Sequence, residues 1–92
     1  PHPRVSVGDT ARITFTDGTS TFLRSQPEGG DNVVDKLPEG TEFEIIGGPI
    51  CYPRPGRNDA YVYWEIRVPS RNNRTGWVAE GDADGYYIEP LP

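Results

Sequence analysis

The 92-residue sequence has one cysteine, one histidine and no methionine. Cys51 has no second thiol for an internal disulfide, so the cysteine count leaves the redox compartment open. A cysteine nucleophile needs a base within reach, and the single histidine, His2, lies in the N-terminal tail. We therefore expect no catalytic residue, and we interpret Cys51 as a small thiol that is buried or half-buried.

The sequence also lacks a long hydrophobic run and an excess of basic residues. No apolar stretch approaches the roughly 18 residues of a membrane-spanning helix, so we expect no membrane insertion. The net charge of −5 argues against nucleic-acid binding, which requires a basic surface. Residues 49–74 carry the largest positive excess and are the only stretch that could favour an anionic partner. We interpret them as a solvated face plus a loop, with an anionic partner as the alternative.

Neither acidic pattern in the sequence completes a catalytic or metal site. Asp82-Ala83-Asp84-Gly85 resembles a fragment of a calcium loop but lacks the further oxygen ligands and the closing glutamate, so it predicts a plain turn. Glu42 and Glu44 are two residues apart on a predicted strand and share a solvated face, whereas a glycosidase acid pair flanks a cleft. The sequence predicts no metal and no cofactor, and we expect a protein that is not an enzyme.

The sequence does contain alternating runs separated by turn residues. Its 11 glycines and 10 prolines occur in short clusters, which favour tight turns over disorder. Gly47-Gly48-Pro49 is expected to end a strand, and residues 50–60 are expected to protrude as an irregular loop. Short strands at this spacing predict a small β-barrel. The expected strands are 10–15, 20–25, 33–37, 41–46, 61–68 and 76–81, with a short turn or strand at 86–88.

A hairpin of residues 61–68 and 76–81 is the predicted centre of the domain, and it contains both tryptophans. Successive side chains on a strand point to opposite faces. The two faces of 61–68 therefore separate Val62, Trp64, Ile66 and Val68 from Tyr61, Tyr63, Glu65 and Arg67. The apolar set is expected to face the core, together with Phe43, Ile45 and Val78. Gly76, directly before Trp77, leaves room for a neighbouring chain to approach.

Several short motifs occur in the order and spacing of a known family. They are Leu23-Arg24-Ser25 followed by Pro27, then Leu37-Pro38-Glu39-Gly40-Thr41, Trp64-Glu65-Ile66-Arg67, Gly76-Trp77-Val78, Glu80-Gly81-Asp82 and Gly85-Tyr86-Tyr87-Ile88-Glu89-Pro90. Together they resemble the bacterial SH3-like (SH3b) domain family. Two features depart from that pattern. Phe22 stands where the family usually has asparagine, and the loop at 52–60 is longer than usual.

The resemblance implies an all-β fold, a small SH3-like barrel of five to six bent antiparallel strands. It also implies a non-catalytic recognition module, often for peptidoglycan or its peptides and sometimes for other proteins. We expect a linker or module boundary at 1–8, the SH3-like domain at 9–90 and a tail at 91–92. Pro1-His2-Pro3 is typical of a module cut from a longer protein. We place that protein in the bacterial cell envelope or outside the cell.

Two hypotheses for function follow. The first is a binding or targeting module of a larger bacterial protein, which recognises cell-wall peptide or protein ligands. The second is a structural spacer, or an intramolecular regulatory domain that packs against other domains of its parent protein and has no ligand of its own. An exposed groove of aromatic rings would favour the first hypothesis, and a flat surface with those rings buried would favour the second.

The candidate ligand-binding residues combine aromatic rings with arginines. Tyrosine supplies a large contact area at a low rotamer cost, and arginine can bind a carboxylate through two parallel hydrogen bonds. Arg24 can also tie the segment around Pro27 to a carbonyl or a carboxylate. For Tyr61 and Tyr63 the alternative is packing beneath the long loop. The candidates are Phe22, Arg24, Tyr52, Arg54, Arg57, Tyr61 and Tyr63.

The assignment of strand faces predicts opposite effects for two neighbouring substitutions. Replacing a buried aromatic residue by alanine costs about 3–5 kcal/mol, out of a total stability of about 5–15 kcal/mol. Trp64→Ala should therefore largely unfold the domain, while Glu65→Ala should leave its stability nearly unchanged. Thermal melts of both variants measure this difference, and a well-folded Trp64→Ala protein would mean that the two faces are reversed.

Overall fold

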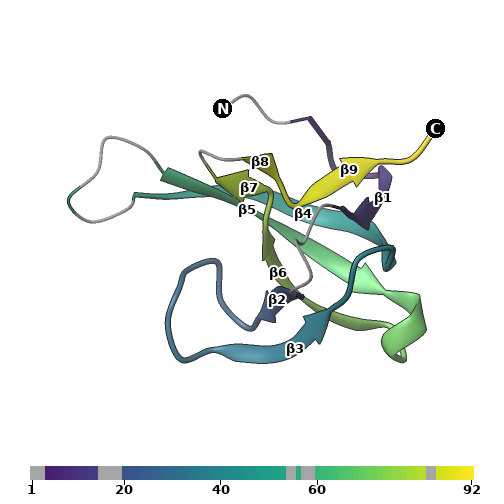
Figure 1. Cartoon of the computed structure of the whole chain (residues 1–92), viewed down its shortest axis with the longest axis horizontal. Helices are drawn as coiled ribbons and strands as arrows, with labels where there is room; N and C mark the ends of the chain where they lie inside the picture. Colours follow the sequence, from purple (N-terminus) through teal and green to yellow (C-terminus); the bar gives the residue numbers. More distant parts are fainter. Residues whose placement is uncertain (1–3, 15–19, 54–55, 57–59, 83–84) are drawn as a thin grey trace.

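The computed structural model describes residues 4–14, 20–53, 56, 60–82 and 85–92 (Figure 1). These residues form β-strands and one short 3-10 helix, and none of their helices is long and apolar enough to cross a membrane. The elements are β1 (Thr10–Ile13), β2 (Thr21–Arg24), β3 (Val33–Leu37), β4 (Glu42–Pro53), β5 (Ala60–Val68), η1 (Pro69–Arg71), β6 (Arg74–Ala79), β7 (Gly81–Asp82), β8 (Gly85–Tyr86) and β9 (Ile88–Pro90).

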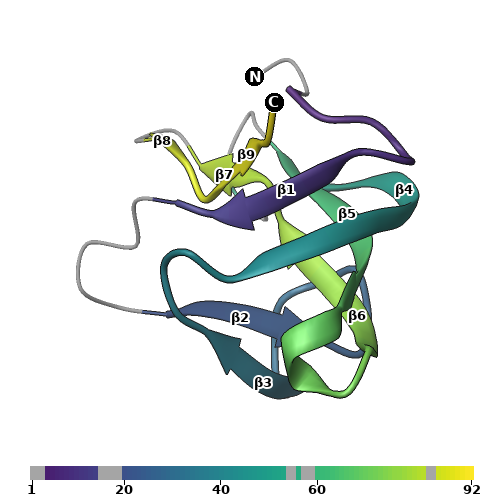
Figure 2. The same ribbon diagram turned by 90° about the vertical axis from the view of Figure 1, so that its right-hand side faces the viewer.

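Seven of the strands form one antiparallel sheet in the order β3-β2-β6-β5-β4-β1-β9, and β7 pairs separately with β8. The large sheet curls around the core as a half-barrel (Figure 2). The all-β, SH3-like class expected from the sequence is therefore confirmed. The sheet exceeds the five to six strands that the resemblance implies, because the end of the chain returns as β9 and pairs with β1.

The core lies on the inner face of the curled sheet. Trp64, Ile66 and Val68 alternate along β5 and are buried, as the pattern of that strand predicts. Val5 is also buried in this cluster, although it belongs to the stretch expected to be a linker. The core residues are Val5, Ala11, Ile13, Leu23, Leu37, Phe43, Ile45, Trp64, Ile66, Val68, Val78 and Ile88.

Strand β4 does not end at Gly47-Gly48-Pro49, and the expectation of an irregular segment from residue 50 is wrong. The pairing with β5 shifts register on both sides of Gly47 and then resumes, with Ile50 opposite Tyr63 and Tyr52 opposite Tyr61. Bulges of this kind absorb extra residues without ending a strand. Gly48 has a φ of +100°, and a Cβ there would lie 3.0 Å from the carbonyl oxygen of Tyr63. Glycine therefore allows the bulged backbone to stay against β5.

Gly76 marks the place where β2 reaches β6. A Cβ on Gly76 would lie 2.8 Å from the carbonyl oxygen of Arg24 and 2.8 Å from Cδ1 of Leu23. Real Cβ contacts do not come this close, so only glycine permits the approach. The expectation that Gly76 makes room for a neighbouring chain is confirmed.

Glu80 follows β6 and is buried, with 3% of its surface exposed. Its Oε1 accepts a hydrogen bond of 2.6 Å from the indole Nε1 of Trp64, and its Oε2 accepts one of 2.7 Å from the backbone N–H of Arg4. The backbone of Glu80 also bonds to Val62 and Tyr87 at 2.8 and 2.7 Å. One residue therefore joins the N-terminal segment, the central strand and the C-terminal strands.

Because the Glu80 carboxylate satisfies two donors in a buried position, its removal should destabilise the domain. Leaving a buried donor unsatisfied costs about 1–3 kcal/mol. Glu80→Ala should therefore lower the unfolding midpoint in urea far more than Glu42→Ala, which removes an exposed carboxylate of β4. Equal midpoints for the two variants would show that the Glu80 carboxylate does not support the fold.

Candidate ligand-binding face

Side chains of β4 and β5 form an aromatic group on the side of the sheet away from the core. Residues directly opposite each other in an antiparallel pair point to the same side. The pairs Ile50–Tyr63 and Tyr52–Tyr61 therefore share one surface. The rings of Tyr61 and Tyr63 lie 5.9 Å apart between centroids and are tilted by 59°. Tyr52 and Ile50 are exposed at 41% and 42%.

Tyr63 is buried, with 2% of its surface accessible, so it does not offer an exposed ring. The continuation of β4 places Ile50 on one side of Tyr63, and β6 places Ala79 on the other. The alternative of structural packing therefore describes the ring of Tyr63, while Tyr61 near the start of β5 is half-buried.

Arg24 fixes the loop between β2 and β3. Its Nη1 donates hydrogen bonds of 2.9 Å to the carbonyl oxygen of Gly30 and 2.9 Å to Oδ1 of Asn32. Asn32 in turn donates from Nδ2 to the carbonyl oxygen of Glu28 at 2.9 Å. The prediction that Arg24 ties this loop to a carbonyl is confirmed. The loop therefore holds the backbone of Glu28 at a defined position.

The electrostatics of Tyr63 show which charged groups surround it. Burial raises the pKa of its phenol above the ordinary 10.0, because the phenolate loses hydration. Arg24 lowers this pKa, and Tyr61, Glu28 and Tyr52 raise it. The structure therefore brings together four of the predicted residues, Arg24, Tyr52, Tyr61 and Tyr63. It adds Glu28, which carries no signal in the sequence because its position depends on the loop closure by Asn32.

Phe22 and Trp77 extend this face across β2 and β6. Phe22 is 43% exposed, and the guanidinium carbon of Arg24 lies 5.3 Å from its ring centroid. Trp77 is half-buried and pairs in register with Arg24 on one side and Glu65 on the other. Sequence reasoning did not include Trp77 among the candidates. Alternation with the core residue Val78 was the signal that could have placed it on this face.

We call the resulting surface the aromatic face. It comprises Phe22, Arg24, Glu28, Ile50, Tyr52, Tyr61, Tyr63 and Trp77. Arg54 and Arg57, the two remaining candidates, lie outside the residues that the structure describes.

Cys51 is exposed, so the interpretation as a buried or half-buried thiol is wrong. It pairs with Val62 where β4 and β5 extend together beyond the other strands (Figure 1). Residues on such an extension have a strand neighbour on one side only and no layer of core above them. The sequence could not show this, because residue 51 was expected to lie in an irregular loop.

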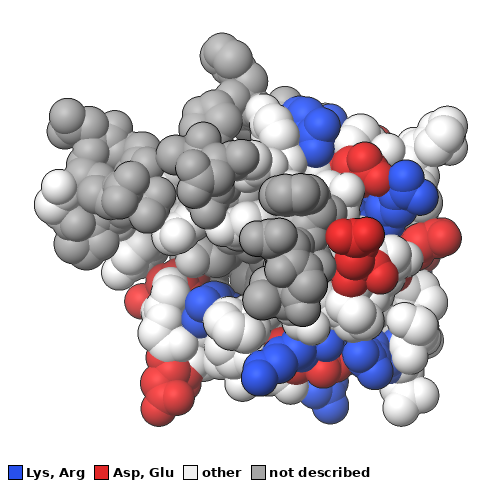
Figure 3. Space-filling view, in the orientation of Figure 1, with Lys and Arg blue, Asp and Glu red and all other residues white. Residues whose placement is uncertain are grey.

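The described arginines of the basic stretch contact the protein's own groups. Arg67 donates to Glu44 at 2.6 Å, Arg71 lies 3.5 Å from Asp35, and Arg74 donates to the carbonyl oxygen of Val34 at 2.9 Å. In the space-filling view, basic and acidic side chains alternate along the margin where β3 and β6 lie (Figure 3). These three arginines therefore serve internal contacts. Among the described residues, no group of three or more His, Cys, Asp or Glu side chains could hold a metal ion.

Comparison with known families gives one match. The family model described as a bacterial SH3 domain matches residues 19–84, which is more than half of the chain. This span includes every residue of the aromatic face. No curated protein and no solved structure matches the chain significantly.

The raised pKa of Tyr63 predicts a specific alkaline sensitivity. Below pH 10 the phenol is protonated in the folded and unfolded chains, so it has no effect on the pH dependence of stability. As the pH rises above 10, the unfolded chain ionises first and the folded state loses stability. Tyr63→Phe should reduce this loss, as measured by melting temperature between pH 8 and pH 11.5. Tyr52→Phe, at an exposed position, should retain it; an unchanged alkaline loss in Tyr63→Phe would contradict the assignment.

Proposed function

Because the chain belongs to the bacterial SH3 domain family, we propose that it is a non-catalytic module that binds an extended peptide, cell-wall or protein ligand on its aromatic face. Domains of this family are generally binding modules without catalytic activity. The proposal makes peptide stems of peptidoglycan the first ligand class to test. It places the parent protein in the cell envelope or outside the cell.

One observation carries this proposal: aromatic rings and both signs of charge gather on a single face. The exposed rings of Tyr52 and Phe22 offer contact area, and the charges of Arg24 and Glu28 both act on the pKa of the Tyr63 phenol. Exposed rings beside polar groups are typical of recognition surfaces. A peptide has carboxylates, amines and backbone amides that match these groups.

Arg24 is the cation of the aromatic face. Its hydrogen bonds to Gly30 and Asn32 both leave from Nη1. A guanidinium can bind a carboxylate through two parallel hydrogen bonds.

We place the ligand on the aromatic face, between Tyr52 of β4 and the turn at 22–27. Contacts of this kind predict weak binding, with a dissociation constant in the micromolar to millimolar range, or about −4 to −8 kcal/mol. Such affinities suit a module that acts within a larger protein, because linked modules reinforce one another.

A second candidate function is a structural spacer or intramolecular regulatory domain. The burial of Tyr63 favours it, since a ring that packs within the sheet offers little surface to a ligand. The partner in that case is another domain of the parent protein. The two functions differ in whether a free ligand perturbs the aromatic face.

Heteronuclear NMR titration with soluble peptidoglycan fragments and a peptide library tests the proposal. We expect shifts confined to Tyr52, Tyr61, Tyr63 and the turn at 22–27. Tyr52→Ala should abolish them, whereas Val7→Ala, which also removes an exposed apolar side chain, should not. No shifts with any ligand, or shifts centred on Asp82, would favour the spacer.

A further inference from the structure

We infer that Arg71 and Arg74 are positioning residues for the aromatic face. They latch the hairpin of β2 and β3 to the rest of the sheet, and that hairpin carries Phe22, Arg24 and Glu28. The inference rests on the proposed function for its effect on binding, but the latch itself can be tested without a ligand.

Few backbone contacts hold this hairpin to the sheet. Strand β2 meets β6 through a single register pair, Arg24 with Trp77. By comparison, β5 and β6 pair from Tyr63–Ala79 to Val68–Arg74 without interruption. Strand β3 ends the sheet order and pairs only with β2. The hairpin therefore depends on side chains for its orientation.

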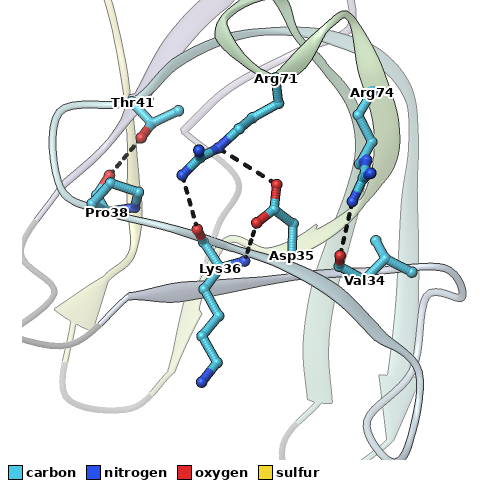
Figure 4. A network of polar contacts seen from close by, with 7 residues as sticks. All are labelled: Val34, Asp35, Lys36, Pro38, Thr41, Arg71 and Arg74. Carbon is cyan, nitrogen blue, oxygen red and sulfur yellow. Dashed lines mark hydrogen bonds and ion pairs between the residues drawn. The ribbon is translucent and has the colours of Figure 1, made fainter.

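The latch consists of two arginines that reach the free edge of β3 (Figure 4). Arg74 Nη1 donates to the carbonyl oxygen of Val34 at 2.9 Å, and Arg71 Nη2 donates to that of Lys36 at 3.4 Å. Carbonyls two residues apart on a strand point to the same side. Both arginines therefore bind the side of β3 that has no neighbouring strand.

Asp35 completes the latch. Its Oδ1 accepts a hydrogen bond of 2.8 Å from the backbone N–H of Lys36, and its Oδ2 lies 3.5 Å from Nε of Arg71. The carboxylate therefore orients Arg71 toward Lys36. Its side chain is 24% exposed and that of Arg71 is 42% exposed, so salt will weaken this ion pair.

The link between the two arginines explains why both point to β3. Asn72 and Asn73, which lie between them, have φ values of 57° and 58°. Asparagine tolerates this left-handed conformation better than most residues. The chain therefore turns sharply after η1 and begins β6 with Arg74 on the same side as Arg71, as Figure 4 shows.

The latch sets orientation, whereas the core supplies most of the attachment energy. Leu23 and Leu37 anchor the hairpin in the core and are fully buried. Removing the arginines should therefore leave the domain folded. The hairpin would then pivot on its leucines, and Arg24 and Glu28 would lose their fixed places beside Tyr63.

The double variant Arg71→Ala/Arg74→Ala tests the inference in two measurements. Hydrogen exchange should show protection of β2 and β3 amides falling roughly tenfold, as expected for the loss of two side-chain hydrogen bonds. The dissociation constant for a soluble muropeptide should rise roughly threefold to tenfold, about the net effect of one hydrogen bond. Two single variants at Arg74 refine the test. Arg74→Lys can still donate to Val34, so its exchange and its dissociation constant should change less than those of Arg74→Ala.

Arg12→Ala is the matched control, because Arg12 is an exposed arginine paired with Glu89 at the opposite edge of the sheet. It should change neither the exchange of β2 and β3 nor the affinity. Unchanged exchange in the double variant would overturn the latch. If the β2 and β3 amides lost protection while the muropeptide affinity stayed unchanged, the positioning role of the two arginines would be overturned. If the wild-type protein binds no muropeptide, the proposed function fails for this ligand, and the exchange measurement still decides whether the latch exists.

Discussion

The hydrogen bonds of the buried Glu80 carboxylate are the constraint on which the rest of the structure depends. This side chain receives donors from Trp64 in the central strand and from the backbone of Arg4 near the N-terminus. Burying a carboxylate is costly unless it is hydrogen-bonded, so both contacts must form together with the core. The position of Glu80 thereby fixes where the N-terminal segment lies and allows Val5 to enter the core.

The strands of the large sheet differ in how many backbone pairs hold them together. Strands β4, β5 and β6 pair over long ladders, while the β2–β3 hairpin joins them through one backbone pair, two buried leucines and a pair of arginines. The aromatic face includes residues from both parts of the sheet. Tyr52, Tyr61 and Tyr63 belong to the strands with long ladders, and Phe22, Arg24 and Glu28 belong to the hairpin and its loop. A small movement of the hairpin would therefore change the face without disturbing the core. Weak attachment beside a binding surface is typical of regions that adjust to a ligand.

Much of the fold was predictable because burial follows local alternation. The pattern of β5 placed Trp64, Ile66 and Val68 in the core, and Gly76 was expected to leave room for a neighbouring chain, which the structure identifies as β2. The site was only partly predictable. Arg24 could be assigned its loop contact from nearby residues, and alternation with Val78 could have placed Trp77 on the outer face. Glu28 gave no such signal, because its place depends on the closure of the loop by Asn32. The register that sets Trp77 opposite Arg24 joins distant parts of the chain, so neither strand's own sequence shows it.

The sequence by itself determined the all-β class, the strand faces and the family, since these follow from alternation, turn residues and motif order. Only the tertiary structure decided that β4 runs through Gly47-Gly48-Pro49, that Tyr63 is buried and that Cys51 is exposed. Glycine and proline usually end strands, and here pairing with β5 outweighs that local preference by absorbing the extra residues in bulges. The accessibility of Tyr63 and Cys51 depends on which strands flank them. That information belongs to the register between strands and not to either strand's own sequence.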